Sequence, residues 1–355
     1  MSRGGRSNNG KGHSHMIRRF LALLAAAAAF PAAAQQPAAA PSFSGPVLRT
    51  NFADPFVLAV GNRYLAYATN AHGDRANVPV AFSSDLVTWN LMAVPGDPDR
   101  FHDALPTLPA WAQRGRTWAP EVMRIGNRYV LYFSAHHRAS GRQCVGAATA
   151  ADPRGPFVPQ GAEPLVCQHA LGGTIDASPF RDTDGKLYFY FKNDGNAINR
   201  PTQIWAQRLA DDGLSLQGEA VPIARNDTPW EGRISEAPFM VRRGAGYYLF
   251  FSANDYAWQP RQRLSQYATG YARCTGPLGP CTDAPENPIL ASRQRPDCLS
   301  GPGHPAIFEA NGRHYMVFHA WSAKRGCRPD RDERFMHIAP IEWNGDAPVI
   351  GRPAQ

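Results

Sequence analysis

Ile175-Asp-Ala-Ser-Pro179, followed by Tyr188-Phe-Tyr-Phe191, is one of five copies of a phrase that recurs through this chain of 355 residues. Each copy has a proline and, nine or ten residues later, a tyrosine that opens an aromatic or apolar run. The prolines are Pro55, Pro120, Pro179, Pro238 and Pro305, and the tyrosines are Tyr64, Tyr129, Tyr188, Tyr248 and Tyr315. Successive tyrosines lie 65, 59, 60 and 67 residues apart. A strand-rich repeat of this length is typical of a β-propeller or a similar array.

Each repeat unit reads as a series of short strands separated by turns. An apolar strand starts at the proline, a glycine turn such as Gly126-Asn127 follows, and the aromatic run forms the second strand. A third strand is rich in small and branched residues, as in Val145-Gly-Ala-Ala-Thr149, and a fourth is less distinct. Five such units predict an all-β fold, a five-bladed β-propeller that spans residues 51–348. The alternative is a β-sandwich or two β-domains, which the regular spacing disfavours.

The N-terminal sequence predicts export. Arg18-Arg19 precede an apolar run at 20–30, and small residues follow at 32–34. This pattern is typical of a secretory signal peptide and is too short for a membrane span, with an uncleaved anchor as the alternative. We therefore expect a signal peptide over 1–34, a linker or lead-in over 35–50 and a tail over 349–355. The mature protein would be secreted or periplasmic, with no membrane attachment after cleavage.

Charge and cysteine content agree with export. The formal charge of +8 comes largely from residues 1–34, and the rest of the chain holds 32 basic and 29 acidic residues. That balance argues against nucleic acid or an anionic membrane as a partner. Six cysteines suit an oxidising compartment. The C-x-x-C spacing that would favour a cysteine-bound metal does not occur. Short loops favour pairing between neighbours, namely Cys144 with Cys167, Cys274 with Cys281, and Cys298 with Cys327.

The residues just ahead of the prolines differ between units and carry the candidate chemistry. Equivalent positions of the innermost strands of a propeller face one mouth of its channel, so Asp54, Asp176 and Glu236 would meet there with Trp118 and His304. One ionised and one protonated carboxyl at the same pH suit hydrolysis of a glycosidic bond. A tryptophan face can stack on a sugar ring. The alternatives are solvated turn acids and a buried strand tryptophan.

Several motifs together resemble those of glycoside hydrolase family 43. They are Asn51-Phe-Ala-Asp54-Pro55, Trp118-Ala-Pro120-Glu-Val122, Ile175-Asp176-Ala-Ser-Pro179, Ser235-Glu236-Ala-Pro238, Gly301-Pro-Gly-His304 and Arg334-Phe-Met-His-Ile-Ala-Pro340-Ile-Glu-Trp343. The resemblance covers nearly all of the mature chain, with the motifs in the same order. It implies a five-bladed propeller and inverting hydrolysis of arabinose- and xylose-containing glycans.

The resemblance also implies roles for the three acids. Asp54 would be the general base that activates water, Glu236 the general acid, and Asp176 the residue that orients the acid and tunes its pKa. An inverting reaction needs the base and acid carboxyls roughly 6.5–9.5 Å apart. We expect a third negative charge near Glu236 to help keep that side chain protonated.

Three further positions are expected to contact substrate or an ion. Trp118 would be a sugar platform, and Arg334 resembles an arginine that contacts sugar hydroxyls, with a surface salt bridge as the alternative. His304 resembles a histidine that lies beside a calcium ion through water in arabinan-cleaving members. A hydrogen-bonded core histidine is the alternative there. No cofactor is required, because inverting hydrolysis needs only two carboxyls and water.

The sequence favours a secreted exo-acting α-L-arabinofuranosidase on pentose-containing glycans. A β-xylosidase and an endo-α-1,5-L-arabinanase stay open, although an insertion at 97–116 would favour exo action if it walls off one end of the site. Retaining fructan hydrolases are a more distant alternative, with carboxyls only about 5–5.5 Å apart. They typically carry arginine where Ile175 stands, which counts against them. A glycan-binding propeller without catalysis is the non-enzyme alternative. The sequence carries no signal for oligomeric state.

Overall fold

The computed structural model describes residues 45–70, 76–258, 264–295, 298–324 and 327–351. These residues belong to one compact unit, 41–355. The predicted signal peptide, most of the predicted linker and the last residues of the predicted tail lie outside the described residues, so these parts stay predictions. No helix in the described ranges has both the length and the apolar content needed to cross a membrane.

Five four-stranded antiparallel sheets, here called blades 1 to 5, follow one another along the described chain. Blade 1 contains β1 (Phe56–Val60), β2 (Arg63–Tyr67), β3 (Val80–Ser83) and β4 (Asn90–Leu91). Blade 2 contains β7 (Ala112–Ile125), β8 (Arg128–His137), β9 (Arg142–Ala150) and β10 (Val158–Gln160). Blade 3 contains β11 (Thr174–Arg181), β12 (Leu187–Asn193), β13 (Gln203–Leu209) and β14 (Leu216–Arg225).

Blade 4 contains β15 (Ser235–Arg243), β16 (Gly246–Ala253), β17 (Ala268–Cys274) and β18 (Cys281–Asp283). Blade 5 contains β19 (Gly303–Ala310), β20 (Arg313–Lys324), β21 (Arg328–Asn344) and β22 (Ala347–Ile350). A separate two-stranded sheet pairs β5 (Ala93–Val94) with β6 (Asp97–Phe101). Three short 3-10 turns complete the described elements: η2 (His169–Leu171), η3 (Gly195–Ile198) and η4 (Pro229–Glu231).

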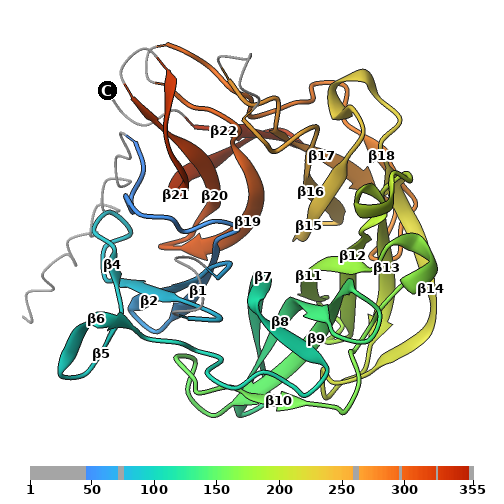
Figure 1. Ribbon diagram of the computed structural model, residues 1–355. Helices are drawn as coiled ribbons and strands as arrows, with labels where there is room; N and C mark the ends of the chain where they lie inside the picture. Colours follow the sequence, from blue (N-terminus) through green and yellow to red (C-terminus); the bar gives the residue numbers. More distant parts are fainter. Residues whose placement is uncertain (1–44, 71–75, 259–263, 296–297, 325–326, 352–355) are drawn as a thin grey trace, which may run out of the picture. The chain divides into compact units, whose positions relative to one another are not determined.

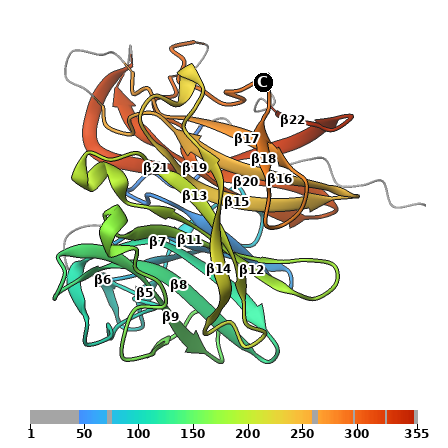
Figure 2. The same cartoon turned by 90° about the vertical axis from the view of Figure 1, so that its right-hand side faces the viewer.

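The first strand of each blade lies nearest a common centre (Figure 1). β1 contacts both β7 and β19, β11 contacts both β7 and β15, and β15 contacts β19. The five innermost strands therefore form a closed ring, which confirms the predicted β-propeller. Figure 2 shows the blades from the side, with β14 of blade 3 toward the viewer.

The aromatic runs form the second strands, as predicted, and they are buried because neighbouring blades cover both of their faces. In β12 every residue from Leu187 to Asn193 is buried. Each of the five hydrophobic clusters draws its residues from two adjacent blades. Three tyrosines also donate their hydroxyl protons to a carbonyl of the next blade: Tyr67 to Pro153, Tyr132 to Gly213 and Tyr190 to Pro277, over 2.6 to 2.8 Å. The repeated phrase therefore specifies the interfaces between blades.

The segment before β1 closes the ring. The backbone N–H of Val47 donates to the Met336 carbonyl at 2.9 Å, and that of Phe52 donates to the Arg334 carbonyl at 2.8 Å. Both acceptors lie on β21 of blade 5, so residues 47–52 run beside the last blade. The described part of the predicted linker or lead-in is therefore attached to blade 5 by hydrogen bonds.

Three disulfides confirm the predicted neighbour pairing. They join Cys144 to Cys167, Cys274 to Cys281, and Cys298 to Cys327, with Cα–Cα distances of 4.8, 3.9 and 5.4 Å. Cys274 and Cys281 stand opposite each other on β17 and β18. Each disulfide closes a loop within one repeat unit, so none of them joins the first blade to the last.

Candidate active site

A backbone irregularity recurs where each innermost strand begins. One residue per blade has a positive φ: Asp54 (53°), Ala119 (46°), Asp176 (58°), Ala237 (55°) and His304 (57°). In blades 2 to 5 the pairing with the second strand shifts register across this residue. Such a shift is a β-bulge, which bends the strand and redirects its side chains. These five positions are therefore structurally equivalent.

The bulges show that the three acids do not all occupy the same position of the repeat. Asp54, Asp176 and His304 occupy the residue with positive φ, whereas Trp118 and Glu236 stand one place earlier, ahead of Ala119 and Ala237. Proline spacing alone did not reveal this offset, because it does not show where a strand bulges. The offset presents Glu236 from a different backbone position than Asp54.

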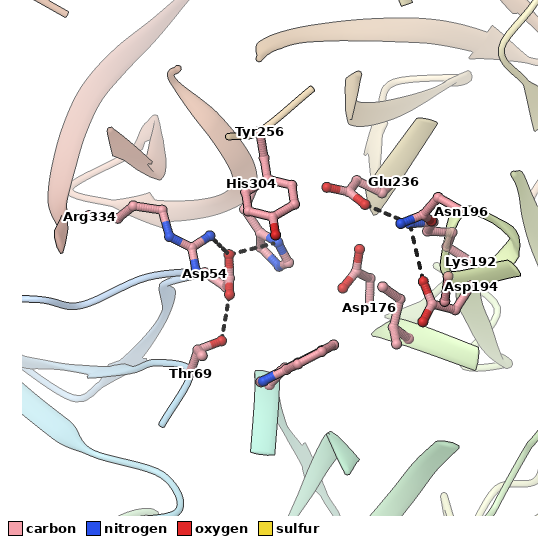
Figure 3. Close-up of a pocket in the computed structure, with 13 residues that line it drawn as sticks. Asp54, Thr69, Asp176, Lys192, Asp194, Asn196, Glu236, Tyr256, His304 and Arg334 are labelled. Carbon is pink, nitrogen blue, oxygen red and sulfur yellow. Dashed lines mark hydrogen bonds and ion pairs between the residues drawn. The ribbon is translucent and has the colours of Figure 1, made fainter. Parts of the chain in front are cut away.

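All six residues predicted for the site line one cavity of about 260 Å³. The sequence had pointed to Asp54, Trp118, Asp176, Glu236, His304 and Arg334. Figure 3 shows Asp54, Thr69 and Arg334 on one side of the cavity, and Glu236, Lys192 and Asp194 on the other. Asp176 lies between the two groups, on the side of Glu236. Residues far apart in the sequence thus form two charged clusters that face each other.

Asp54 is held by cationic and hydrogen-bonding groups. Its Oδ1 accepts from the Arg334 guanidinium at 3.0 Å, and its Oδ2 accepts from the Thr69 hydroxyl at 2.5 Å. The Nδ1 atoms of His304 and His319 lie 3.4 and 3.2 Å from Oδ1. Burial would raise the pKa of Asp54, but the Arg334 charge and the two histidines outweigh it and hold that pKa well below its usual value. Asp54 is therefore an ionised carboxylate.

Arg334 is itself fixed in place. Its backbone N–H donates to Oδ1 of Asn51 at 3.0 Å. Its guanidinium lies 5.9 Å from the ring centre of Tyr256 and 5.8 Å from that of Trp321. Trp321 Nε1 donates to the Tyr256 carbonyl at 2.7 Å, which holds the two aromatic residues together. This clamp aims the arginine at Asp54.

Glu236 is ion-paired on the opposite side of the cavity. Its Oε2 lies 2.6 Å from Nζ of Lys192, and its Oε1 accepts from the Tyr267 hydroxyl at 2.8 Å. Burial raises the pKa of Glu236, but Lys192 and Tyr267 together outweigh burial and lower that pKa below its usual value. The expectation that a third charge keeps Glu236 protonated is wrong for this arrangement, because the lysine contact favours the ionised form.

Asp176 shows the opposite behaviour. Burial raises its pKa to about 6, and the negative charge of Glu236 adds to that effect, while His304 and Lys192 oppose it. Its Oδ2 accepts from the backbone N–H of Ala237 at 2.9 Å, next to Glu236 in the sequence. Asp176 is therefore the carboxyl that keeps its proton longer, and it is bonded to the strand that carries Glu236.

The sequence reasoning missed five polar or aromatic residues that line the cavity. They are Thr69, Lys192, Asp194, Asn196 and Tyr256. One signal was available: Lys192 directly follows the aromatic run Tyr188-Phe-Tyr-Phe191, and a single charge in a fully buried strand requires a partner. The others lie in turns whose direction the repeat does not specify.

The insertion at 97–116 does not contribute to the lining residues of this cavity. Ala104, Leu105 and Trp111 instead pack into the cluster between blades 1 and 2. The idea that this insertion walls off the site therefore has no support in the described residues. At the cavity, Trp118 supplies one aromatic side chain, and Tyr256, which is 46% exposed, supplies another.

The residues around His304 do not fit direct ligation of calcium, which prefers about six to eight oxygen ligands. In the part of the chain that is described, two groups could hold an ion: His137, Cys144 and His169, and Asp227, Glu231 and Asp283. Neither includes His304, and Cys144 is in a disulfide. An ion held beside His304 through water stays a prediction.

Comparison with known proteins identifies the family. Residues 43–348 match Glycosyl hydrolases family 43. The chain therefore belongs to this family of glycosidases, as its motifs predicted. A crystal structure of a thermostable family-43 glycoside hydrolase is 27% identical and superposes with a TM-score of 0.73, covering 89% of this chain and 98% of that one.

The curated relatives carry several specificities. A β-D-galactofuranosidase of Aspergillus niger is 29% identical over 77% of this chain and 75% of its own length. A putative β-xylosidase of Xylanibacter ruminicola is 24% identical over 85% of this chain. A non-reducing end α-L-arabinofuranosidase of Bacteroides ovatus is 24% identical over 88% of this chain. This chain spans 50% and 54% of the latter two proteins.

Proposed function

We propose that this protein is a secreted inverting glycoside hydrolase of arabinose- and xylose-containing glycans, acting as an exo α-L-arabinofuranosidase. One observation carries the proposal: a single cavity places Asp54, whose pKa Arg334 and two histidines hold well below its usual value, opposite Glu236 and Asp176, whose pKa is raised to about 6. Inverting hydrolysis needs this division between a base and an acid across the sugar.

In the proposed reaction, Asp54 accepts a proton from a water molecule as that water attacks the anomeric carbon. Glu236 donates a proton to the glycosidic oxygen, and the bond between that oxygen and the anomeric carbon breaks. Asp54 ends protonated and Glu236 ends ionised, so one proton returns through solvent before the next turnover. Asp176 accepts a hydrogen bond from the Ala237 N–H and so helps orient the neighbouring Glu236. In the proposed reaction, Asp176, with its raised pKa, supplies the proton that Glu236 passes to the glycosidic oxygen.

The size of the cavity supports exo action. At about 260 Å³ it lies below the range of roughly 300–1,000 Å³ usual for drug-sized ligands, which suits a single sugar ring. Trp118 offers that ring an apolar face, and Arg334 offers donors to its hydroxyls. A β-xylosidase or an endo-α-1,5-L-arabinanase would use the same carboxyls. These two activities are therefore the alternatives that the substrate panel must distinguish from exo α-L-arabinofuranosidase activity.

A β-D-galactofuranoside is a second candidate substrate. The relative from Aspergillus niger bears that activity in its name. The β-D-galactofuranosyl ring has the ring configuration of α-L-arabinofuranose and one additional side-chain carbon, so both sugars can present the same anomeric centre to Asp54. Asn196 lines the cavity as a further polar side chain for such a substituent.

The test is a panel of aryl α-L-arabinofuranoside, β-D-xyloside and β-D-galactofuranoside, with linear arabinan and arabinoxylan. We expect the arabinofuranoside to be the best aryl substrate and arabinan to release monomers. Proton NMR should show inversion at the anomeric carbon. Retention, or release of oligomers first, would overturn the inverting or the exo assignment respectively.

The catalytic assignment predicts large losses in two variants. Asp54→Ala and Glu236→Ala should each lower kcat on glycans by roughly 10²–10⁴-fold, because each removes a proton-transfer group. The Glu236→Ala loss should be smaller on aryl glycosides whose leaving groups need little protonation. Asp184→Ala is the matched control, because Asp184 is an exposed turn acid paired with Lys186, and it should leave kcat unchanged. Near-normal turnover of Asp54→Ala or Glu236→Ala would refute the assignment.

Secretion belongs to the same proposal. A relative named as an extracellular exo-α-(1→5)-L-arabinofuranosidase, from Cellvibrio japonicus, is 22% identical over 82% of this chain. Three disulfides suit an oxidising compartment. N-terminal sequencing of the exported protein should find a start after residue 34, and retention of the apolar run at 20–30 would overturn cleavage.

A further inference from the structure

We propose that Lys192 is a positioning residue whose fixed ammonium strengthens the acid, because it stabilises the Asp176–Glu236 pair after the pair has given up its proton. This inference rests on the proposed function, in which Glu236 donates that proton. Lys192 acts through Glu236 and needs no contact with the sugar.

The placement of Lys192 supports this role. Its side chain is 0% exposed and lies near the end of β12, the strand next to β11 and its Asp176. Nζ lies 2.6 Å from Oε2 of Glu236 and 3.9 Å from Oδ1 of Asp194. A buried ammonium persists only when negative charge compensates it. The contact with Glu236 on β15 crosses from blade 3 to blade 4.

The charges around the pair explain why the lysine matters after donation. When the proton leaves, Asp176, Glu236 and the buried Asp194 all carry negative charge at one side of the cavity. Arg334 cannot neutralise them, because it is bonded to Asp54 on the opposite side. Lys192 touches Glu236 directly, so its charge lowers the free energy of the state without the proton relative to the state with it.

Several elements that pack around Lys192 and Glu236 contribute titratable or charged groups, whereas β13 places the apolar Ile204 opposite Lys192. These groups are Glu121 on β7, Arg142 on β9, Asp176 on β11, Lys192 on β12, Asp194 after β12, Glu236 on β15, Tyr267 before β17 and His304 on β19, with Asp54 across the cavity. Asp194 is the second acid that faces the lysine. Removing its charge should therefore have the opposite effect to removing the charge of Lys192.

The experiment measures kcat/KM against pH for wild type, Lys192→Met, Lys192→Arg and Asp194→Asn. Without the lysine charge the carboxyl pair should hold its proton to higher pH, so the alkaline limb of Lys192→Met should move up by about one pH unit or more. Lys192→Arg keeps the positive charge, so its alkaline limb should lie at the wild-type position. Asp194→Asn should move it down. Lys186→Met, an exposed lysine of the same blade, should leave the limb in place.

Leaving-group dependence supplies a second readout. A weaker acid in Lys192→Met should cost more than about tenfold in kcat on alkyl glycosides or glycans, and clearly less on a dinitrophenyl glycoside. Equal losses on all leaving groups, with the alkaline limb unmoved in Lys192→Met and Asp194→Asn, would show that Lys192 is only structural. If Lys192→Met does not fold, an unmoved limb in Asp194→Asn overturns the inference. Inactive wild type on every glycoside would instead refute the proposed function.

Discussion

Asp54 is a partly buried carboxylate that stays ionised because of its neighbours. Its side chain is 12% exposed, and burial alone would favour the neutral form. The Arg334 guanidinium at 3.0 Å, together with His304 and His319, reverses that preference. A base that must be unprotonated over a wide pH range benefits from this arrangement, because its pKa then lies far below the working pH.

We therefore expect Arg334→Met to change the pH dependence of kcat/KM at acidic pH. The pKa of Asp54 is lowered in the native site, so loss of the arginine should raise it, and the acidic limb of kcat/KM should move to higher pH by about one unit. The pH profile on an aryl arabinofuranoside measures this shift. Arg331→Met is the control, because Arg331 lies on the same strand, is exposed and forms an ion pair with Glu333 at 3.8 Å, away from Asp54. An unchanged acidic limb in Arg334→Met would disprove the electrostatic role.

At the residue scale, the sequence predicted which acids meet but not their protonation. Asp54, Asp176 and Glu236 could be found because each stands a few places before a proline of the repeat. The Lys192–Glu236 pair joins strands of different blades, and its effect on the pKa of Glu236 depends on a distance that no single repeat contains. This is why the expected protonation of Glu236 was wrong.

At the element scale, the residue with positive φ at the start of each innermost strand has a conformational cost. A positive φ is unfavourable for residues with a Cβ, and Ala119 and Ala237 adopt it without any functional side chain of their own. Their role is to carry the bend that presents Trp118 and Glu236. The proline phrase predicted the strands, but the bulges depend on cross-strand register, which the spacing of prolines does not reveal.

This strain predicts an unusual response to glycine. Ala→Gly in a strand normally lowers the free energy of unfolding by roughly 0.5–1 kcal/mol, and Ala206→Gly on β13 should do at least that. Ala237→Gly should be less destabilising than Ala206→Gly by about 1 kcal/mol, because glycine relieves the left-handed strain. Both alanines are buried in strands. Denaturant unfolding compares them, and equal losses in the two variants would contradict a strained bulge.

At the scale of the whole molecule, stability is divided between the blade interfaces and covalent links inside the blades. Five hydrophobic clusters and the three tyrosine hydroxyls join neighbouring blades. The regular period made five units predictable. The attachment of residues 47–52 to β21 was not, because that segment carries none of the repeated phrase.

The disulfides should contribute according to the loops that they close. Cys298 and Cys327 are 29 residues apart, and Cys274 and Cys281 are 7 apart. Loop-closure entropy predicts that Cys298→Ser with Cys327→Ser lowers the free energy of unfolding by about 3–4 kcal/mol, and the shorter pair by about 2. Calorimetry should show the larger loss as a fall in Tm of roughly 5 °C. A larger loss for the short loop would exclude this explanation.

The placement of the two charged clusters has a consequence for how the protein is made. Lys192, Asp176 and Glu236 belong to blades 3 and 4, which leave the ribosome in succession and can assemble together. Asp54 leaves it early, but Arg334, His304 and His319 are synthesised near the end. The proposed base therefore meets Arg334 and the two histidines only when the last blade docks against residues 47–52. On the proposed mechanism, hydrolysis thus requires the last blade, and a chain truncated before blade 5 would possess the proposed acid without the Arg334 and histidine partners of the proposed base.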